Sequence, residues 1–299
     1  MVNPPLVSIL IPTYNSPFFE PALLSALNQT YQNTEIIVGD DSENDHAERV
    51  VKKHPNAKLR YIRNAVRLGF HGNFANCFEQ ARGEYIKFLN HDDLLHPDCA
   101  AAMVRAFEVG GSGVTLVTSS RLIIDDKGEV QAGRAVTEPL SNVDCAIGGF
   151  YLGDLALSNG MNFIGEPTTA MFRKADVDVI DGSLFRIGDR QYLCLADLCL
   201  WLRLLAKGKA IYLVNPLSCF REHDAQLQTS TEGAALCIVE RLYLPVDART
   251  IGFLKDDAAY RMAIDNATGL IRKYHDMQGG CEADRVVYAQ ALKVAGGIV

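Results

Sequence analysis

The stretch Val7–Asn15, which reads VSILIPTYN, is a short apolar run that ends in a polar turn. Two later stretches have the same form, Glu35–Ser42 (EIIVGDDS) and Tyr85–Asp93 (YIKFLNHDD). Short apolar runs that alternate with helical patterns are typical of buried parallel strands. The carboxyl ends of such strands meet at one edge of the sheet, where open α/β folds bind their ligands. The sequence therefore predicts one ligand site built from these three turns.

The turns are rich in carboxylates and contain no glycine-rich phosphate loop. Asp40 and Asp41 end the second run, and Asp92 and Asp93 end the third. In phosphate sites Mg²⁺ is usually held by one or two carboxylates together with phosphate oxygens. The pattern therefore indicates a nucleotide whose diphosphate is bound through a divalent metal, which is the chemistry of sugar transfer.

The spacing of apolar residues predicts an α/β fold with a doubly wound, mostly parallel sheet. Strands are expected at 58–62 and 114–119, and a hairpin at 122–131. Helical spacing is found at residues 21–27, 47–53, 73–81, 95–108 and 197–207. Residues of about 133–165 are less regular, because the glycines in Gly148-Gly149 and Asn159-Gly160 indicate breaks. We expect loops there that shape an acceptor site.

The pattern after residue 230 is mainly helical, as in Ala258–Ile264. We therefore expect a catalytic domain at 1–230, with a nucleotide-binding half at about 1–95 and an acceptor half at 96–230, followed by a helical extension at 231–299. The apolar face of this extension must be buried against the catalytic domain, another subunit or a membrane surface. A homo-oligomer and further domains of a longer chain are both compatible with the sequence.

Composition excludes some classes of partner. The 299 residues include 29 basic and 36 acidic side chains, a net charge of -7, without a basic tract. Nucleic acid is therefore not an expected partner, because binding to its backbone relies on clustered positive charge. Eight cysteines without a Cys-x-x-Cys pair, and no secretory leader, favour a reduced, cytoplasmic compartment. No segment is apolar for the roughly 20 residues that a span needs, although peripheral association with the inner membrane face is compatible with the sequence.

Several of these stretches resemble motifs of family 2 glycosyltransferases with the GT-A fold, over residues 7–93 and, with further matches, to about Ser230. The strand followed by Pro-x-Tyr-Asn stands at Ile11–Asn15, and the Asp-Asp-x-Ser/Thr-x-Asp turn stands at Asp40–Asp45. The run before the metal motif ends in Ala81–Ile86. The resemblance implies a Rossmann-like sheet and an inverting enzyme that uses a nucleotide-diphosphate sugar, UDP- or dTDP-linked, with a glycan or lipid-linked glycan acceptor.

The resemblance also implies a site for Mn²⁺ or Mg²⁺. Asn90-His91-Asp92-Asp93 stands where the family has Asp-x-Asp, so Asp92 is the expected metal ligand, while Asn90 replaces the first aspartate. Arg221-Glu222-His223 matches the family's Arg-x-His, which suggests His223 as a second ligand and Arg221 as a diphosphate contact. The alternatives are that Asp92 and Asp93 cap a following helix and that the histidine lies on the surface.

Donor contacts are expected from the turns. Asp40 and Asp41 resemble residues that face the base and ribose, and Tyr14 offers a ring or a hydroxyl. Without the resemblance, a simple turn and a half-buried tyrosine are the ordinary interpretation. The remaining candidate donor contacts are Pro12, Thr13, Asn15, Asn73 and His91.

Leu195–Leu204 (LADLCLWLRL) resembles the segment in which an acidic pair precedes a Leu-Trp-Leu-Arg helix. The first acid is Ala196 here, and Asp197 aligns with the second, which makes Asp197 the candidate general base. A helix cap is the alternative for Asp197. Trp201 is either an acceptor contact or, by its helical spacing, a core residue, and Glu166 is a candidate acceptor contact.

Two other functions remain compatible with these residues. A catalytically silent nucleotide-sugar-binding or scaffold domain is one, because Asn90 and Ala196 depart from the family pattern. A nucleotidyltransferase is the other, but it would be expected to carry a glycine-rich basic loop after the first strand. That position holds Pro12–Asn15 instead.

Overall fold

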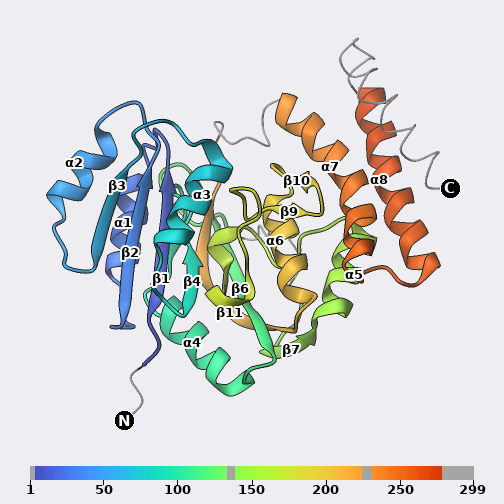
Figure 1. Ribbon diagram of the computed structural model, residues 1–299, viewed down its shortest axis with the longest axis horizontal. Coiled ribbons are helices and arrows are strands. Elements are labelled where there is room, and N and C mark those ends of the chain that lie inside the picture. Colours follow the sequence, from blue (N-terminus) through green and yellow to red (C-terminus); the bar gives the residue numbers. More distant parts are fainter. Residues whose placement is uncertain (1–3, 133–138, 224–230, 278–299) are drawn as a thin grey trace.

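A computed structural model describes residues 4–132, 139–223 and 231–277. Its central sheet has the strand order β3-β2-β1-β4-β8-β6-β11-β5, and β7 pairs with β11 outside this path (Figure 1). The strands of this sheet are β1 (Val7–Thr13), β2 (Thr34–Asp40), β3 (Leu59–Arg63), β4 (Tyr85–Phe88), β5 (Leu94–Leu95), β6 (Val114–Ile124), β7 (Cys145–Gly148), β8 (Ala170–Arg173) and β11 (Lys209–Arg221). A separate short pair is formed by β9 (Arg186–Ile187) and β10 (Arg190–Gln191).

The first four strands are parallel, as the sequence predicts. β1 lies between β2 and β4, with Val7 opposite Thr34 on one side and Tyr85 on the other. Every residue of β1, β2 and β4 is buried, which fits their largely apolar sequences, and the buried residues include Glu35 and Lys87. The register brings the ends of β1 and β2 level, since Thr13 pairs with Asp40.

Helices cover both faces of the sheet. Alternate strand residues point to opposite faces, so Ile9 and Ile36 pack in one cluster and Leu10 and Ile37 in the other. The first cluster includes side chains of α1 (Phe19–Leu27), α2 (His46–Lys53) and α4 (Cys99–Gly110). The second includes side chains of α3 (Gly69–Gln80), α5 (Gly149–Asn159) and α6 (Ala196–Leu205).

The second half departs from the parallel order. β8 is antiparallel to both β4 and β6, whereas β11 runs parallel to β6. The expected hairpin is present, because the Gln131 N–H donates to the Ile123 carbonyl beside an Ile124–Val130 bridge. With the C-terminal helices described below, this arrangement confirms the predicted fold class.

The expectation of loops at about 133–165 was wrong for residues 149–159, which form α5. Gly148 is the residue before this helix, and Gly160 ends it in the left-handed conformation at φ 62°. The two glycine dipeptides therefore mark the ends of a helix rather than an irregular segment. Gly149 also permits close packing, because a Cβ there would lie 1.9 Å from the Leu205 carbonyl oxygen.

The C-terminal part forms two long helices, α7 (Thr231–Thr250) and α8 (Asp257–Met277), which lie side by side next to α5 and α6 (Figure 1). Leu244, Phe253 and Leu254 are fully or almost fully buried in the same cluster as Trp201. These apolar side chains are thus covered by the first 230 residues. The boundary at residue 230 stays a prediction, and 278–299 lie outside the described residues.

Cys194 and Cys237 form a disulfide with a Cα–Cα distance of 5.1 Å. The cysteine spacing did not predict this pair, which joins the segment before α6 to α7. In the parts of the chain that the structure describes, no helix is long and apolar enough to cross a membrane.

Candidate active site

A cavity of about 440 Å³ opens at the carboxyl ends of β1, β2 and β4. Its wall includes nine of the residues selected from the sequence, namely Pro12, Thr13, Tyr14, Asp41, Asn73, His91, Asp92, Asp197 and His223. The strand ends and the start of α6 therefore face one shared space. Whether each residue binds a ligand stays a prediction.

Asn15 ties the first turn to the second. It has a positive φ of 49°, a conformation that asparagine adopts more readily than most residues. Its N–H donates to the Ser42 hydroxyl at 2.8 Å, and its side-chain oxygen accepts from the Glu43 N–H at 3.1 Å. Asn15 is not among the described residues that line the cavity, so the structure gives it a supporting role.

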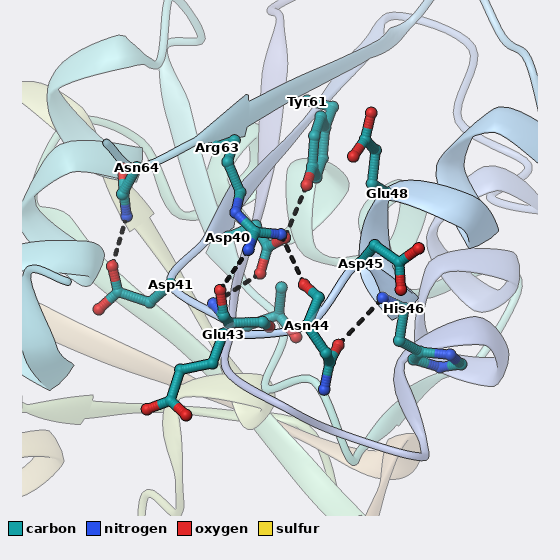
Figure 2. A network of polar contacts seen from close by, with 12 residues as sticks. Asp40, Asp41, Glu43, Asn44, Asp45, His46, Glu48, Tyr61, Arg63 and Asn64 are labelled. Carbon is teal, nitrogen blue, oxygen red and sulfur yellow. Dashed lines mark hydrogen bonds and ion pairs between the residues drawn. The ribbon is translucent and has the colours of Figure 1, made fainter. Parts of the chain in front are cut away.

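Asp40 was expected to face the nucleotide, but it is fully buried beneath the turn. Its carboxylate accepts from the Tyr61 hydroxyl at 2.6 Å and from Arg63 at 3.0 Å, as Figure 2 shows. It also accepts from the Ser42 N–H at 2.9 Å. Burial, together with the bond to Asp40, raises the pKa of Tyr61 to about 12. Asp40 therefore holds the turn in place.

Asp41 does reach the cavity. One carboxylate oxygen accepts from Asn64 at 2.7 Å (Figure 2), and the other accepts from the Gly69 N–H at 2.7 Å. Gly69 is the first residue of α3, so this carboxylate also lies at the positive end of a helix dipole. α3 lies close to β2, because a Cβ on Gly39 would come within 2.6 Å of the Asn73 side chain.

Arg67 is a cavity residue that the sequence did not reveal. Its guanidinium carbon lies 4.1 Å from the centroid of the Tyr14 ring, and the Tyr14 hydroxyl donates to Glu43 at 3.1 Å. Arg67 is exposed and is the only arginine or lysine among the described lining residues. No motif marks it, because the loop before α3 has no periodic pattern.

Asp92 and His223 meet at the cavity wall, although they are 131 residues apart. The His223 Nε2 atom lies 3.1 Å from an Asp92 carboxylate oxygen, and each side chain is 16% exposed. A carboxylate and an imidazole are suitable ligands for Mn²⁺, and Mg²⁺ commonly takes one or two protein carboxylates. Among the described residues no group of three or more acidic, histidine or cysteine side chains is arranged to hold a metal. The pair therefore fits an ion that takes its remaining ligands from phosphate and water.

Asp93 does not cap a helix but holds together the residues around the Asp92–His223 pair. It is 1% exposed and accepts from the Thr168 hydroxyl at 2.6 Å, from Asn90 at 3.1 Å and from the Arg221 N–H at 3.0 Å. The next helix begins several residues later, with Asp98 as its cap. Burial raises the pKa of Asp93 well above its usual range.

Arg221 was expected to face the diphosphate. Instead its side chain is buried, donates to the carbonyl oxygens of Asp92 and Asp125 at 2.7 Å each, and lies over the Phe18 ring. A buried guanidinium must satisfy several donors, and these carbonyl oxygens accept from it. Arg221 thus fixes the backbone of Asp92, and it is not among the described residues that line the cavity.

Asp197 also lines the cavity, in the first turn of α6. Its carboxylate accepts from the Leu198 N–H at 2.7 Å and from Asn162 at 2.9 Å. Burial is the main cause that raises the pKa of Asp197 to about 7, and the negative charge of Glu166 adds to it. The N-cap position is Leu195, which provides no side-chain cap, and the bond from the Leu198 N–H shows that Asp197 satisfies one of the first-turn N–H groups. This contact is compatible with a second role as a base. Asn162, which the sequence did not mark, orients this carboxylate.

The two predicted acceptor contacts lie behind this wall. Glu166 pairs with Arg121 at 2.9 Å, and only 12% of its side chain is exposed. Trp201 is fully buried, and its indole N–H donates to the Gly165 carbonyl at 2.7 Å. Its assignment as an acceptor contact is therefore corrected to the alternative, a core residue. Neither residue is among the described lining residues.

The family model described as "Glycosyl transferase family 2" matches residues 8–180. The chain belongs to glycosyltransferase family 2. That range contains the three strand-end turns, Asp92 and Asn162, but ends before Asp197 and His223. The recognition made from the motifs is thus confirmed.

Relatives of this glycosyltransferase include an uncharacterized protein of Mycobacterium tuberculosis (strain CDC 1551 / Oshkosh), which is 33% identical over 77% of this chain and 71% of its own length. A GalNAc(5)-diNAcBac-PP-undecaprenol beta-1,3-glucosyltransferase of Campylobacter jejuni is 36% identical over 30% of this chain, which is 31% of that protein. Several other relatives match over only about a fifth to a third of their own length, for example 21% of a Rickettsia felis glycosyltransferase.

Among solved structures, S. aureus TarS 1–349 in complex with UDP-GlcNAc superimposes with a TM-score of 0.67. The match covers 96% of this chain and 79% of that chain, at 15% sequence identity. At this identity the similarity shows the fold alone. It extends beyond the residues that the family model matches, since it covers 96% of this chain.

Proposed function

We propose that this glycosyltransferase moves a sugar from a nucleotide-diphosphate sugar to a hydroxyl of a glycan or lipid-linked glycan, with inversion at the anomeric carbon. One observation supports the proposal most: the Asp92–His223 pair and the Asp197 carboxylate lie on the wall of the same cavity. Glycosyl transfer by single displacement needs a group that assists the leaving diphosphate and a base on the acceptor side.

On the donor side, Asp41 and Tyr14 would contact the base and ribose. The Asp41 carboxylate accepts three hydrogen bonds, from Asn64, Leu68 and Gly69, which hold it in one orientation at the cavity. Tyr14 offers a ring face that Arg67 already covers on one side. Arg67 supplies a positive charge near the mouth, where a planar guanidinium suits phosphate oxygens.

Asp92 and His223 are the residues that would hold Mn²⁺ or Mg²⁺. When bound, such an ion neutralises negative charge on the departing diphosphate. Arg221 and Asp93 keep these ligands in place through the Asp92 carbonyl and the Arg221 N–H. These buried contacts would keep a small set of metal ligands in position, as metal sites require.

On the acceptor side, Asp197 acts as the general base. The acceptor oxygen attacks the anomeric carbon, its proton passes to the Asp197 carboxylate, and the bond between that carbon and the diphosphate oxygen breaks. A base works best when its pKa lies near the working pH, and burial raises the pKa of Asp197 to about 7. Asn162 holds the carboxylate at 2.9 Å, which fixes its direction. The undecaprenol-linked substrate in the name of the Campylobacter jejuni relative supports a lipid-linked glycan as one acceptor class.

The test is a panel of UDP- and dTDP-sugars with Mn²⁺, Mg²⁺ or EDTA, followed by thermal stability and by release of the nucleoside diphosphate. A ligand that binds only the folded state raises stability by about 2.7 kcal/mol at 100 times its Kd, which is several degrees for a chain of this size. We expect UDP or dTDP to give this shift with metal and a clearly smaller one with EDTA.

Asp92→Asn should remove the metal-dependent part of the shift and leave the unliganded melting temperature nearly unchanged. The matched control is Asp265→Asn, because Asp265 is exposed on α8. Equal shifts with metal and with EDTA in the wild-type chain would refute the metal-bridged diphosphate. Binding of a sugar nucleotide without any turnover would favour a silent binding domain.

A further inference from the structure

The acceptor side of the cavity includes the short segment Leu193–Leu195, which lies between β10 and α6 and is not part of the sheet. Leu193 and Cys194 line the cavity, and Leu195 is the residue before α6. Asp197 follows two residues later. The position of this segment therefore determines where the candidate base lies relative to the donor side.

Three consecutive backbone N–H groups of this segment point at one carboxylate. Glu240 accepts from the Leu193 N–H at 2.8 Å with one oxygen, and from the N–H groups of Cys194 at 2.9 Å and Leu195 at 2.7 Å with the other. Glu240 lies in the middle of α7 and is 5% exposed. A buried carboxylate with this number of charge-assisted bonds holds its partners firmly.

Neighbouring contacts keep Glu240 in place. About two turns further along α7, Asp247 accepts from the Tyr192 hydroxyl at 2.6 Å and from Arg190 at 2.8 Å. These contacts dock α7 against the chain just before the segment, outside the described cavity wall. The Cys194–Cys237 disulfide adds a covalent link from α7 to the segment itself.

We infer that Glu240 is a positioning residue, which fixes the segment Leu193–Leu195 and thereby the acceptor side of the active site. This inference rests on the proposed function, in which Asp197 is the base. It gives the C-terminal helices a part in the reaction. Glu240 does not line the described cavity, so it acts through the segment rather than on the substrate.

The test compares Glu240→Gln and Glu240→Asp with the wild-type chain, with dithiothreitol present so that the disulfide does not hold the same segment. An amide cannot accept on both sides, so at least one of the three N–H groups then faces a donor. In Glu240→Asp the negative charge is kept, but the side chain is too short to accept from all three N–H groups. Asp265→Asn on α8 is the control for a change of charge in the C-terminal helices.

Three measurements are made on each chain: calorimetric binding of UDP with Mn²⁺, amide hydrogen exchange, and hydrolysis of the best sugar nucleotide from the panel, with water in place of the acceptor. We expect the UDP Kd to stay within about twofold, since the donor turns are not touched. Exchange at 193–195 should rise about tenfold or more. The hydrolysis kcat should fall about tenfold or more, because small misplacements of catalytic groups are costly.

Exchange at 193–195 that equals the wild-type rate would overturn the inference, as would faster exchange with unchanged kcat. Loss of UDP binding in both variants would also overturn it, because Glu240 would then support the whole fold. If the wild-type chain hydrolyses no sugar nucleotide, the proposed function fails instead. The exchange comparison then decides by itself whether Glu240 fixes the segment.

Discussion

Replacing Asp197 with asparagine should both stop the reaction and stabilise the protein above neutral pH. The stability effect follows from linkage. Burial raises the pKa of Asp197 to about 7 from its ordinary value of 3.8. The folded state therefore binds the Asp197 proton more tightly than the unfolded state does. Below about pH 4 this tighter binding adds its full share to the free energy of unfolding, and that share is lost as the pH rises from about 4 through 7.

The size of the effect can be worked out from these two values. Between pH 5 and pH 8 this difference in proton binding lowers the free energy of unfolding of the wild-type chain by about 3 kcal/mol. The wild-type chain should lose this free energy of unfolding over that range, and Asp197→Asn should not. The lost bond from Asn162 costs the variant about 1 kcal/mol, but this cost is the same at both pH values.

The assay is thermal unfolding of both chains at pH 5 and pH 8. We expect the melting temperature of Asp197→Asn, relative to wild type, to be about 5 to 10 °C higher at pH 8 than at pH 5. Transfer or hydrolysis should fall by at least about 100-fold, the usual contribution of a general base. If the difference in melting temperature between the two chains does not change with pH, the raised pKa of Asp197 is refuted, whatever the activity shows.

Two further changes test the acceptor side. Asn162→Ala removes a hydrogen bond that lowers the pKa of Asp197, so the acid limb of the pH–rate profile should move to higher pH; an unmoved profile would contradict the role of Asn162. A chain ending at residue 230 should be insoluble or unfold without a cooperative transition, because it uncovers the cluster that contains Leu244, Phe253 and Leu254. A soluble, cooperative product in sedimentation and calorimetry would show that the C-terminal helices are a separate unit.

The donor side could be predicted from the sequence because it is local. Each donor turn follows a strand directly, and parallel strands bring their carboxyl ends to one edge. Asp41, Asp92 and Tyr14 reached the cavity for this reason. The sequence could not separate Asp40 from Asp41, since neighbouring residues at a strand end point in opposite directions. Only the packing of Tyr61 and Arg63 decides that Asp40 is the buried one.

The acceptor side could be predicted only in part because its contacts are distant in sequence. Asn162 and Glu240 lie 35 and 45 residues from their partners Asp197 and Leu195, and no spacing rule connects such pairs. Buried arginine is a related difficulty. Arg221 matches a motif and has the chemistry of a phosphate contact, yet its donors satisfy backbone carbonyl oxygens. A motif can predict that an arginine stands at this position, but only the packing around it determines which groups its guanidinium contacts.

The two sides of the cavity are therefore held by different means. The donor turns follow directly from β1, β2 and β4, whose register sets their position, and side chains such as Asp40 and Arg221 add to this. The acceptor side depends on side chains from distant parts of the chain: Glu240 on α7 holds the backbone of Leu193–Leu195, and Asn162 holds the Asp197 carboxylate. Substitutions in α7 can thus reshape the acceptor side while the donor side keeps its geometry. We therefore expect that related enzymes which use different acceptors differ more in their C-terminal helices than in their strand-end turns.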